Sequence, residues 1–291
     1  MISHRIVGPA DAPVIIALGG ISAGRNVTRA DDGTPGWWED FVGPARAIDT
    51  DHFRVLGVDW LDAPSPISTE AQADAIAALL DHLGVARLHA FVGSSYGGMV
   101  GLAFAARHPS RLGRLVCVSA AHQSHPMATA LRALQREAVQ LGLATGQADR
   151  GMALARGIAM TTYRTVEEFA ERFAMEPERG PAGPRFPVEG YLAEHGRRFI
   201  ERFTPERFLS LSLSLDLHRV DPAAISTSAT LVAVAEDTLV PFQQMEELRA
   251  RLAGPATLDV IHSRYGHDAF LKEVGPIGLV IRRALGAGGA S

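Results

Sequence analysis

A serine within a glycine-rich turn is the residue of this sequence best suited to chemistry. Gly93, Ser95 and Gly97 match the pattern G-x-S-x-G, a sharp turn that lifts a nucleophilic serine off the end of a strand and onto a helix. The context agrees, because residues 88–92 form a short, mostly apolar run and residues 98–108 are small and compatible with a helix. We therefore predict that Ser95 is a nucleophile.

The neighbouring Ser94 is the alternative nucleophile. If Ser94 took the central position of the pattern, the first glycine would be replaced by Val92, whose β-carbon would clash in so tight a turn. A bare G-x-S-x-G also arises by chance, since Gly-Ser sequences are usually ordinary turns. The prediction for Ser95 therefore depends on a base and an acid further along the chain.

The acid that would orient the base is predicted after an apolar run at residues 231–235. Glu236 and Asp237 follow this run and Pro241 begins the next helix, so either carboxylate would lie just past the carboxyl end of a strand. Consecutive side chains leave a strand in opposite directions, and Glu is longer by one methylene, so we favour Asp237. Glu236 stays open as the acid, and Asp237 could otherwise be a simple helix cap.

The predicted base is His267, which follows a further strand-like run at residues 258–261. Gly266 gives the loop the freedom to present the imidazole above the sheet. His262 is a rival, but it lies at the end of the strand itself and has no glycine beside it. Serine, acid and histidine then follow one another in the order that α/β-hydrolases use, each at the end of a predicted strand.

Alternation between apolar runs and helical stretches predicts the fold class. Helical patterns separate most of the strand-like runs, and one clear helix is expected at residues 69–83. Such alternation indicates an α/β fold with a mostly parallel sheet and helices on both faces. The expected strands are residues 14–18, 53–58, 88–92, 115–118, 231–235 and 258–261.

The alternation breaks between about residues 122 and 219, where no convincing strand is found. An all-helical insertion at this place is where α/β-hydrolases carry a cap over the active site. We therefore predict an α/β-hydrolase core domain from residues 1–121 and 220–291, and a helical cap (lid) from residues 122–219. Within the cap, helices are expected at residues 127–141, 150–160, 166–173 and 188–217, and a loop rich in proline at residues 176–187.

Composition agrees with one soluble enzyme. The 291 residues are 47% hydrophobic, and 28 Lys and Arg against 32 Asp and Glu give a net charge of −4, so no basic surface suggests nucleic acid. The apolar runs are too short to span a membrane, and residues 1–5 do not begin a signal peptide. The single cysteine, Cys117, is compatible with a reducing cytoplasm, where we expect the protein. No metal-ligand cluster is found in the sequence, so no metal is expected.

An oxyanion hole needs two backbone N–H groups aimed at the charge that develops on the substrate carbonyl. One should come from Tyr96, the residue after the nucleophile. The other should come from the loop after the strand at residues 14–18, where the sequence continues Gly-Gly-Ile-Ser, and the candidate is Ile21. The double glycine could equally be ordinary turn chemistry.

The chain also carries motifs that resemble those of the homoserine O-acyltransferases, the acetyl- and succinyltransferases of methionine synthesis, which have the α/β-hydrolase fold. The resemblance covers most of the chain. The most specific motifs are an Ala-Arg and Thr-Tyr-Arg helix and a Gly-His-Asp-Ala-Phe-Leu ending, which general esterases lack. The matching segments are residues 36–44, 95–99, 153–156, 160–164, 188–192 and 266–271.

The resemblance implies the substrates and two further site residues. It implies ping-pong transfer through acyl-Ser95, with acyl-CoA as a co-substrate, no bound cofactor and L-homoserine as the acceptor. Arg156 matches the family arginine that holds the amino-acid carboxylate, and Asp268 matches the aspartate that holds its ammonium. A zwitterion needs one fixed cation and one fixed anion, and a guanidinium can bind a carboxylate in a bidentate fork. Without the resemblance, Arg156 would be taken for a solvated arginine and Asp268 for a helix cap.

The chain departs from the family at residues 59–68, which are shorter than the glycine-rich segment of other members. This shortening bears on how the acyl-CoA is held. Residues 119–126 are more similar to succinyl-using members, which favours succinyl-CoA over acetyl-CoA. L-Serine stays open as the acceptor, because it differs from homoserine by one methylene. An esterase or thioesterase with the same three catalytic residues stays open as well, and a homodimer is compatible with the sequence.

Overall fold

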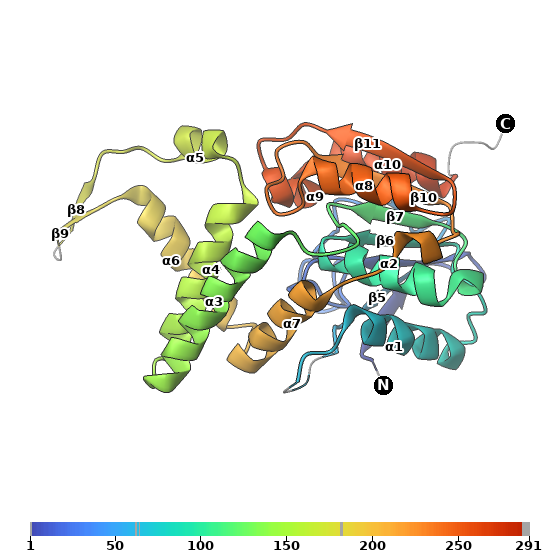
Figure 1. The fold of residues 1–291 in the computed structure, drawn as a ribbon, viewed down its shortest axis with the longest axis horizontal. Helices are drawn as coiled ribbons and strands as arrows, with labels where there is room; N and C mark the ends of the chain where they lie inside the picture. Colours follow the sequence, from blue (N-terminus) through green and yellow to red (C-terminus); the bar gives the residue numbers. More distant parts are fainter. Residues whose placement is uncertain (1, 62, 64, 181–182, 287–291) are drawn as a thin grey trace.

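A seven-stranded sheet forms the centre of the molecule, with strand order β1-β5-β2-β6-β7-β10-β11 (Figure 1). The computed structural model describes residues 2–61, 63, 65–180 and 183–286. β1 runs antiparallel to β5, and the other neighbouring strands of this sheet pair in parallel. The strands are β1 (His4–Val7), β2 (Val14–Leu18), β5 (Arg54–Val58), β6 (Ala90–Ser94), β7 (Leu115–Val118), β10 (Ala229–Val234) and β11 (Ala256–Ile261).

Alternate residues of the central strands face two separate hydrophobic cores. In β2, Ile15 and Ala17 belong to one cluster of buried apolar side chains, whereas Ile16 and Leu18 belong to the other. A strand that is covered on both faces needs apolar side chains at consecutive positions. The central strands therefore read as continuous apolar runs in the sequence.

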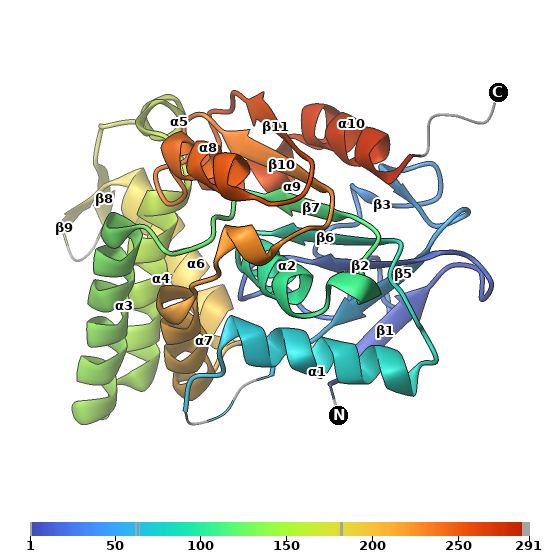
Figure 2. The ribbon, with the colours of Figure 1, turned by 45° about the vertical axis from the view of Figure 1, so that its right-hand side comes forward.

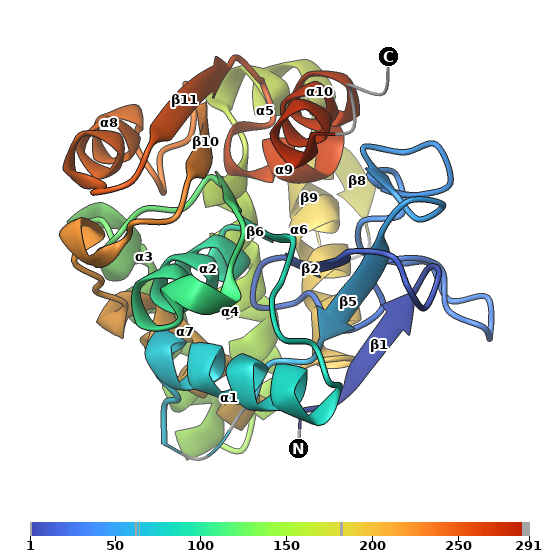
Figure 3. The same ribbon diagram turned by 90° about the vertical axis from the view of Figure 1, so that its right-hand side faces the viewer.

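Helices cover both faces of the sheet (Figure 3). The larger core lies under α1, α2 and α8, and the smaller core lies under α10 and the loop segment 37–48. The short pair of β3 and β4 lies at residues 42–49, and α9 precedes α10. The bounds are α1 (Thr69–His82), α2 (Tyr96–Arg107), α8 (Phe242–Arg251), α9 (Ala269–Lys272), α10 (Val274–Leu285), β3 (Val42–Gly43) and β4 (Ile48–Asp49), with short 3₁₀ turns at Pro109–Arg111, Pro222–Ala224 and Gly266–Asp268.

Between β7 and β10 the chain leaves the sheet and forms a group of helices, residues 126–217, which we call the helical segment (Figures 1 and 2). Its two connections to the sheet run side by side: the N–H of Val220 donates to the carbonyl of His122 over 2.9 Å, and Gln123 pairs with Arg219. The helices are α3 (Pro126–Ala144), α4 (Ala148–Tyr163), α5 (Val166–Arg172), α6 (Pro187–Ile200) and α7 (Pro205–Leu217).

The structure confirms the predicted fold class, with each expected strand present and its ends shifted by at most a few residues. The division into two domains stays a prediction. No helix in the described ranges is both long enough and apolar enough to cross a membrane.

Three local predictions were wrong. The edge strand β1 was missed, because its four residues, His-Arg-Ile-Val, are only partly buried and do not form a continuous apolar run. The region expected to lack strands contains the hairpin of β8 (Glu178–Gly180) and β9 (Gly183–Arg185), within the predicted loop. The stretch expected as one helix at residues 188–217 is split into α6 and α7, because Thr204 caps a new helix that begins at Pro205.

Candidate active site

Ser95 lies at the sharp turn between β6 and α2, with φ 52° and ψ −122°, a backbone conformation that residues with a side chain rarely adopt. The flanking glycines make this turn possible. A β-carbon on Gly93 would lie 2.3 Å from the carbonyl oxygen of Gly97, and one on Gly97 would lie 2.4 Å from the carbonyl oxygen of Leu18. The G-x-S-x-G spacing thus reflects close backbone packing on both sides of the serine.

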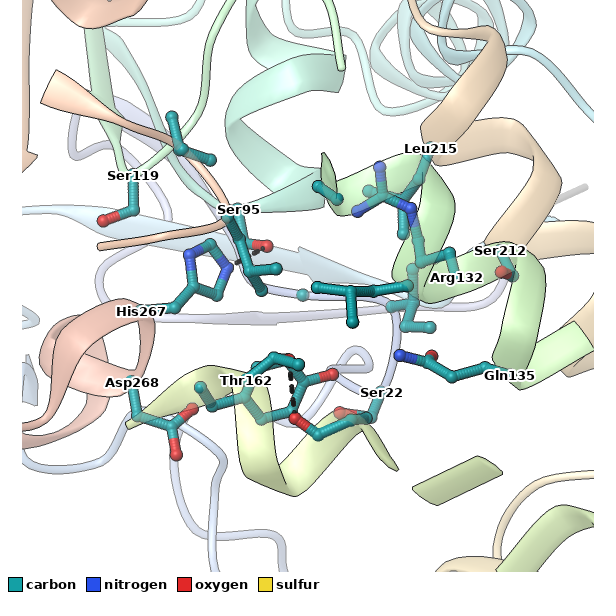
Figure 4. Close-up of a pocket in the computed structure, with 18 of the residues that line it drawn as sticks. Ser22, Ser95, Ser119, Arg132, Gln135, Thr162, Ser212, Leu215, His267 and Asp268 are labelled. Carbon is teal, nitrogen blue, oxygen red and sulfur yellow. Dashed lines mark hydrogen bonds between the residues drawn. The ribbon is translucent and has the colours of Figure 1, made fainter. Parts of the chain in front are cut away.

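The structure brings the predicted serine, histidine and acid together. The hydroxyl of Ser95 lies 2.9 Å from Nε2 of His267 (Figure 4). On the other side of the imidazole, Nδ1 lies 2.7 Å from Oδ2 of Asp237. The second oxygen of Asp237 accepts hydrogen bonds from the N–H groups of Leu239 (2.9 Å) and Val240 (3.0 Å), so the carboxylate is fixed from both sides. This is the geometry of a nucleophile, a base and an orienting acid.

The charge of Asp237 controls the titration of His267. Burial alone would lower the pKa of His267, because it disfavours the charged imidazolium. The negative charge of Asp237 and the hydrogen bond to it outweigh this effect, and Asp268 adds to them. The pKa of His267 is therefore raised above its usual value.

The rival residues lie outside this arrangement. Glu236 faces the other way: its carboxylate binds Nδ1 of His262 (2.9 Å) and the N–H of Ser263 (2.8 Å). Ser94 is fully buried, and its hydroxyl points to the carbonyl of Leu18 at 3.5 Å. Consecutive side chains at a strand end point in opposite directions. Asp237 and Ser95 therefore face His267, whereas Glu236 and Ser94 face away from it.

Ile21 and Tyr96, the two residues predicted to form an oxyanion hole, both lie near Ser95. Ile21 and Ser95 line the same cavity, and Tyr96 follows Ser95 directly. The loop that carries Ile21 is attached to the turn, since the N–H of Gly97 donates to the carbonyl of Gly19 over 2.8 Å. Within the described ranges, neither the N–H of Ile21 nor that of Tyr96 donates to a protein acceptor. Both groups are therefore free to bind an oxygen of a substrate.

A cavity of about 230 Å³ lies between the carboxyl ends of the strands and the helical segment. The sheet contributes Ser95 and His267, and the helical segment contributes apolar walls and a few polar side chains (Figure 4). The predicted residues Arg156 and Asp268 both line it. Its position at the strand ends is where open α/β sheets bind ligands.

Arg156 and Asp268 bring opposite charges to this cavity. The guanidinium of Arg156 lies over the rings of Tyr163 (5.5 Å) and Phe199 (5.2 Å), and it has no carboxylate within ion-pair distance in the part of the chain that the structure describes. Asp268 is held at one oxygen by Nε of Arg164 at 3.4 Å. Burial raises the pKa of Asp268, although the neighbouring cations favour its charged form.

Comparison with known proteins identifies the family. The α/β-hydrolase fold family matches residues 13–274. A homoserine O-succinyltransferase of Xanthomonas campestris pv. campestris is 48% identical over 97% of this chain and 78% of its own length. An L-serine/homoserine O-acetyltransferase of Streptomyces lavendulae is 33% identical over 93% of this chain and 87% of its own. The chain belongs to the homoserine O-acyltransferase family of the α/β-hydrolase fold.

The structure of esterase E22 is similar in fold alone, with a TM-score of 0.88 and 19% identity over 98% of this chain and 93% of that one. The fold is thus shared by esterases and acyltransferases, and the chain's place among the O-acyltransferases comes from its relatives in sequence. It is an acyltransferase. Within the described residues, no group of three or more His, Cys, Asp or Glu side chains could hold a metal ion.

Sequence reasoning missed one charged residue that lines this cavity, Arg132. Its guanidinium lines the cavity, on the side opposite His267 and Asp268 in Figure 4. Nε of Arg132 binds Asp216 at 2.7 Å, and Arg136 binds the other oxygen of the same carboxylate at 2.6 Å. Two guanidinium charges against one carboxylate, 2 − 1, leave one net positive charge at this end of the cavity.

A signal for Arg132 is present in the sequence. The buried residues of α3 include Ala128, Gln135, Val139 and Gly142, which follow the inward stripe of a helix. Arg132 falls on the same stripe, four residues after the first of them. A charged residue on the buried face of an amphipathic helix needs a partner or a ligand, and it is therefore a candidate for function.

Proposed function

We propose that this protein transfers a succinyl group from succinyl-CoA to the hydroxyl of L-homoserine. One observation supports this function best. The cavity that contains the Ser95 hydroxyl also contains an arginine without a carboxylate partner, Arg156, and a carboxylate, Asp268. An amino acid presents a carboxylate and an ammonium, so these two side chains would hold its ends and leave its side-chain hydroxyl to reach Ser95.

In the first half-reaction, the donor thioester would be attacked by the Ser95 oxygen. His267 takes the hydroxyl proton, and Asp237 stabilises the resulting imidazolium. The N–H groups of Ile21 and Tyr96 bind the oxyanion of the tetrahedral intermediate. When the intermediate collapses, the carbon–sulfur bond breaks, His267 protonates the leaving thiolate, and free coenzyme A departs from an acyl ester on Ser95.

In the second half-reaction, the amino acid replaces coenzyme A. Arg156 binds its carboxylate and Asp268 binds its ammonium, while His267 removes the proton from its hydroxyl. The hydroxyl oxygen attacks the acyl ester, and the same oxyanion site stabilises the intermediate. The bond between the acyl carbon and the Ser95 oxygen then breaks, and His267 returns the proton to Ser95. Water would compete for the acyl group, and the walls that the helical segment adds to the cavity limit its access.

The choice of succinyl-CoA rests on Arg132. A succinyl group ends in a carboxylate, whereas an acetyl group has no charge to place. The net positive charge of Arg132 and Arg136 over Asp216 would neutralise that carboxylate inside the cavity. An acetyl group would leave this charge without a partner from the substrate.

The O-acyl-L-homoserine formed in this way carries a better leaving group than homoserine. It would be consumed by a reaction that displaces the acyloxy group, consistent with a role in methionine biosynthesis, and we expect the reaction to occur in the cytoplasm.

A matrix of succinyl-CoA and acetyl-CoA against L-homoserine and L-serine tests this function. Release of free thiol reports the first half-reaction, and mass spectrometry of the O-acyl amino acid reports the second. We expect the highest kcat/KM for succinyl-CoA with L-homoserine. Faster transfer to L-serine would instead make the protein a serine O-acyltransferase, and thiol release without any O-acyl amino acid would make it a thioesterase.

A further inference from the structure

Trp60, which lies in the segment after β5, contacts the loop that carries Ile21. The indole N–H of Trp60 donates to the carbonyl oxygen of Gly20 over 3.0 Å. The same ring packs edge-on against the ring of Tyr96, with 4.8 Å between the ring centres. Trp60 is 3% exposed, so this contact is part of the interior and not a surface encounter. One side chain therefore contacts both Tyr96 and the peptide group that carries the Ile21 N–H.

The hydrogen bond to Gly20 fixes the direction of the Ile21 N–H. The carbonyl of Gly20 and the N–H of Ile21 belong to one planar peptide group, and no cis peptide occurs among the described residues. In a trans peptide these two bonds point in opposite directions. A donor that holds the carbonyl on the side of Trp60 thus directs the N–H to the opposite side. The N–H of Ala23 donates to the same oxygen over 2.9 Å and limits rotation further.

Gln72 of α1 holds the segment that carries Trp60. Its side-chain oxygen accepts the N–H of Leu61 (3.1 Å), and its side-chain nitrogen donates to the Leu61 carbonyl (2.7 Å). Gln72 is only 1% exposed, so both bonds form in the interior, where a missing partner would be costly. The backbone next to Trp60 is thereby fixed to a helix of the core.

We propose that Trp60 is a positioning residue for the oxyanion hole: it orients the Gly20–Ile21 peptide for the acyl carbonyl, with Gln72 as its support. This inference rests on the proposed function, because it assumes that the carbonyl of the donor binds the Ile21 N–H. It gives the segment at residues 59–68 a role, since its second residue is the donor of the hydrogen bond.

The variant Trp60→Phe tests the proposal, because it keeps an aromatic ring beside Tyr96 and removes the indole N–H donor; its loss of ring volume is matched by the control below. Acyl-CoA labelled with ¹³C at the carbonyl and supplied without amino acid should leave the label on Ser95. Infrared spectroscopy then reads the stretching frequency of that carbonyl, which falls as its hydrogen bonds strengthen. We expect a higher frequency in Trp60→Phe than in the wild type. We also expect roughly tenfold slower acylation and deacylation with unchanged KM values, less than the 10²- to 10³-fold loss typical of deleting an oxyanion donor.

Gln72→Met provides a second variant that keeps the side-chain volume and breaks both bonds to Leu61. Gln72→Met should move the carbonyl frequency in the same direction by a smaller amount. If Trp60→Phe does not fold, the frequency in Gln72→Met tests the proposal instead. Trp38→Phe is the matched control, because the Trp38 indole N–H also donates to a buried backbone carbonyl, that of Phe270, over 2.8 Å. It should lose similar thermal stability and leave the frequency unchanged.

The outcomes separate this inference from the proposed function. If the wild type forms no acyl ester on Ser95, the proposed function is wrong, and the proposed role of Trp60 is then wrong as well. If the wild type forms the ester and the frequency is the same in the wild type and both variants, only the inference is wrong. An equal shift in Trp38→Phe would also overturn it, since any lost indole bond would then have the same effect.

Discussion

Nδ1 of His267 and Oδ2 of Asp237 lie 2.7 Å apart, and both side chains are almost completely shielded from water, with 8% and 0% exposure. The pair is thus a charge interaction in a dry environment, where the protonated imidazole is stabilised most by its neighbour. The raised pKa of His267 follows from this contact, since burial without the carboxylate would lower it. The protonation of His267 should therefore be visible in the rate of the first half-reaction.

The pH dependence of acylation is the first prediction. His267 accepts a proton only when it is neutral, so the acylation rate should rise with pH through a pKa above the usual value for histidine. Asp268 also raises this pKa, so Asp268→Asn should move the rise to lower pH. Pre-steady-state release of coenzyme A, measured without amino acid, isolates this step. A shift to higher pH would contradict the assigned charge interaction.

The acid of the triad gives a second prediction. Asp237→Asn should reduce turnover by about ten-thousandfold, the size of effect seen when the orienting acid of a Ser-His-Asp triad becomes an amide. The matched control is Glu236→Gln, one residue earlier, whose carboxylate binds His262 and Ser263 and is outside the triad. It should retain most of the activity. Steady-state kinetics decides the assignment, and the opposite ranking of the two variants would make Glu236 the acid.

The nucleophile is tested by trapping. When the enzyme is mixed with acyl-CoA alone, mass spectrometry of its peptides should find the acyl group on Ser95. Ser95→Ala should form no adduct, whereas Ser94→Ala should still form one, since the Ser94 hydroxyl is buried and points to the Leu18 carbonyl. An adduct on Ser94 in the wild type would move the nucleophile by one residue.

The sequence predicts those features of the fold and the site that leave a local pattern of residues. The buried strands and the triad were predictable, because two-sided burial forces apolar runs and the active residues follow the ends of those runs in a fixed order. The break between α6 and α7 has a local start signal of its own, Thr204 followed by Pro205. The place of Arg132 on the inward stripe of α3 is a local signal, but its pairing with Asp216 could not be predicted, nor could that of Trp60 with Gly20, because both pairs join residues distant in sequence. Such pairings are set by tertiary structure and leave no local pattern.

Donor selection by Arg132 is a further prediction. Arg132→Met should lower kcat/KM for succinyl-CoA at least tenfold relative to acetyl-CoA, since a charge-assisted hydrogen bond to a buried carboxylate is worth about 2 kcal/mol or more. Arg136→Met is the matched control: Arg136 binds the same carboxylate of Asp216 but is not among the residues that line the cavity. It removes the same unit of charge but no group that lines the cavity, so it should lower the ratio of the two donors less than Arg132→Met does. If both variants changed the ratio equally, the effect would come from Asp216 and its surroundings.

The amino-acid site gives the last prediction. Arg156 is proposed to contact only the second substrate, so Arg156→Ala should acylate Ser95 at the wild-type rate and then transfer poorly to L-homoserine. Loss of the guanidinium that pairs with a desolvated carboxylate should cost roughly 2–5 kcal/mol, or about 30- to several thousand-fold in transfer. Arg156→Lys should recover little of this, because an ammonium cannot replace the planar fork. Arg172→Ala is the control, since Arg172 also stacks on an aromatic ring, 4.5 Å from Tyr191, but does not line the cavity. Rapid-quench measurements of the two half-reactions decide it: equal losses in both would assign Arg156 a structural or donor role, and unimpaired transfer would remove it from the amino-acid site.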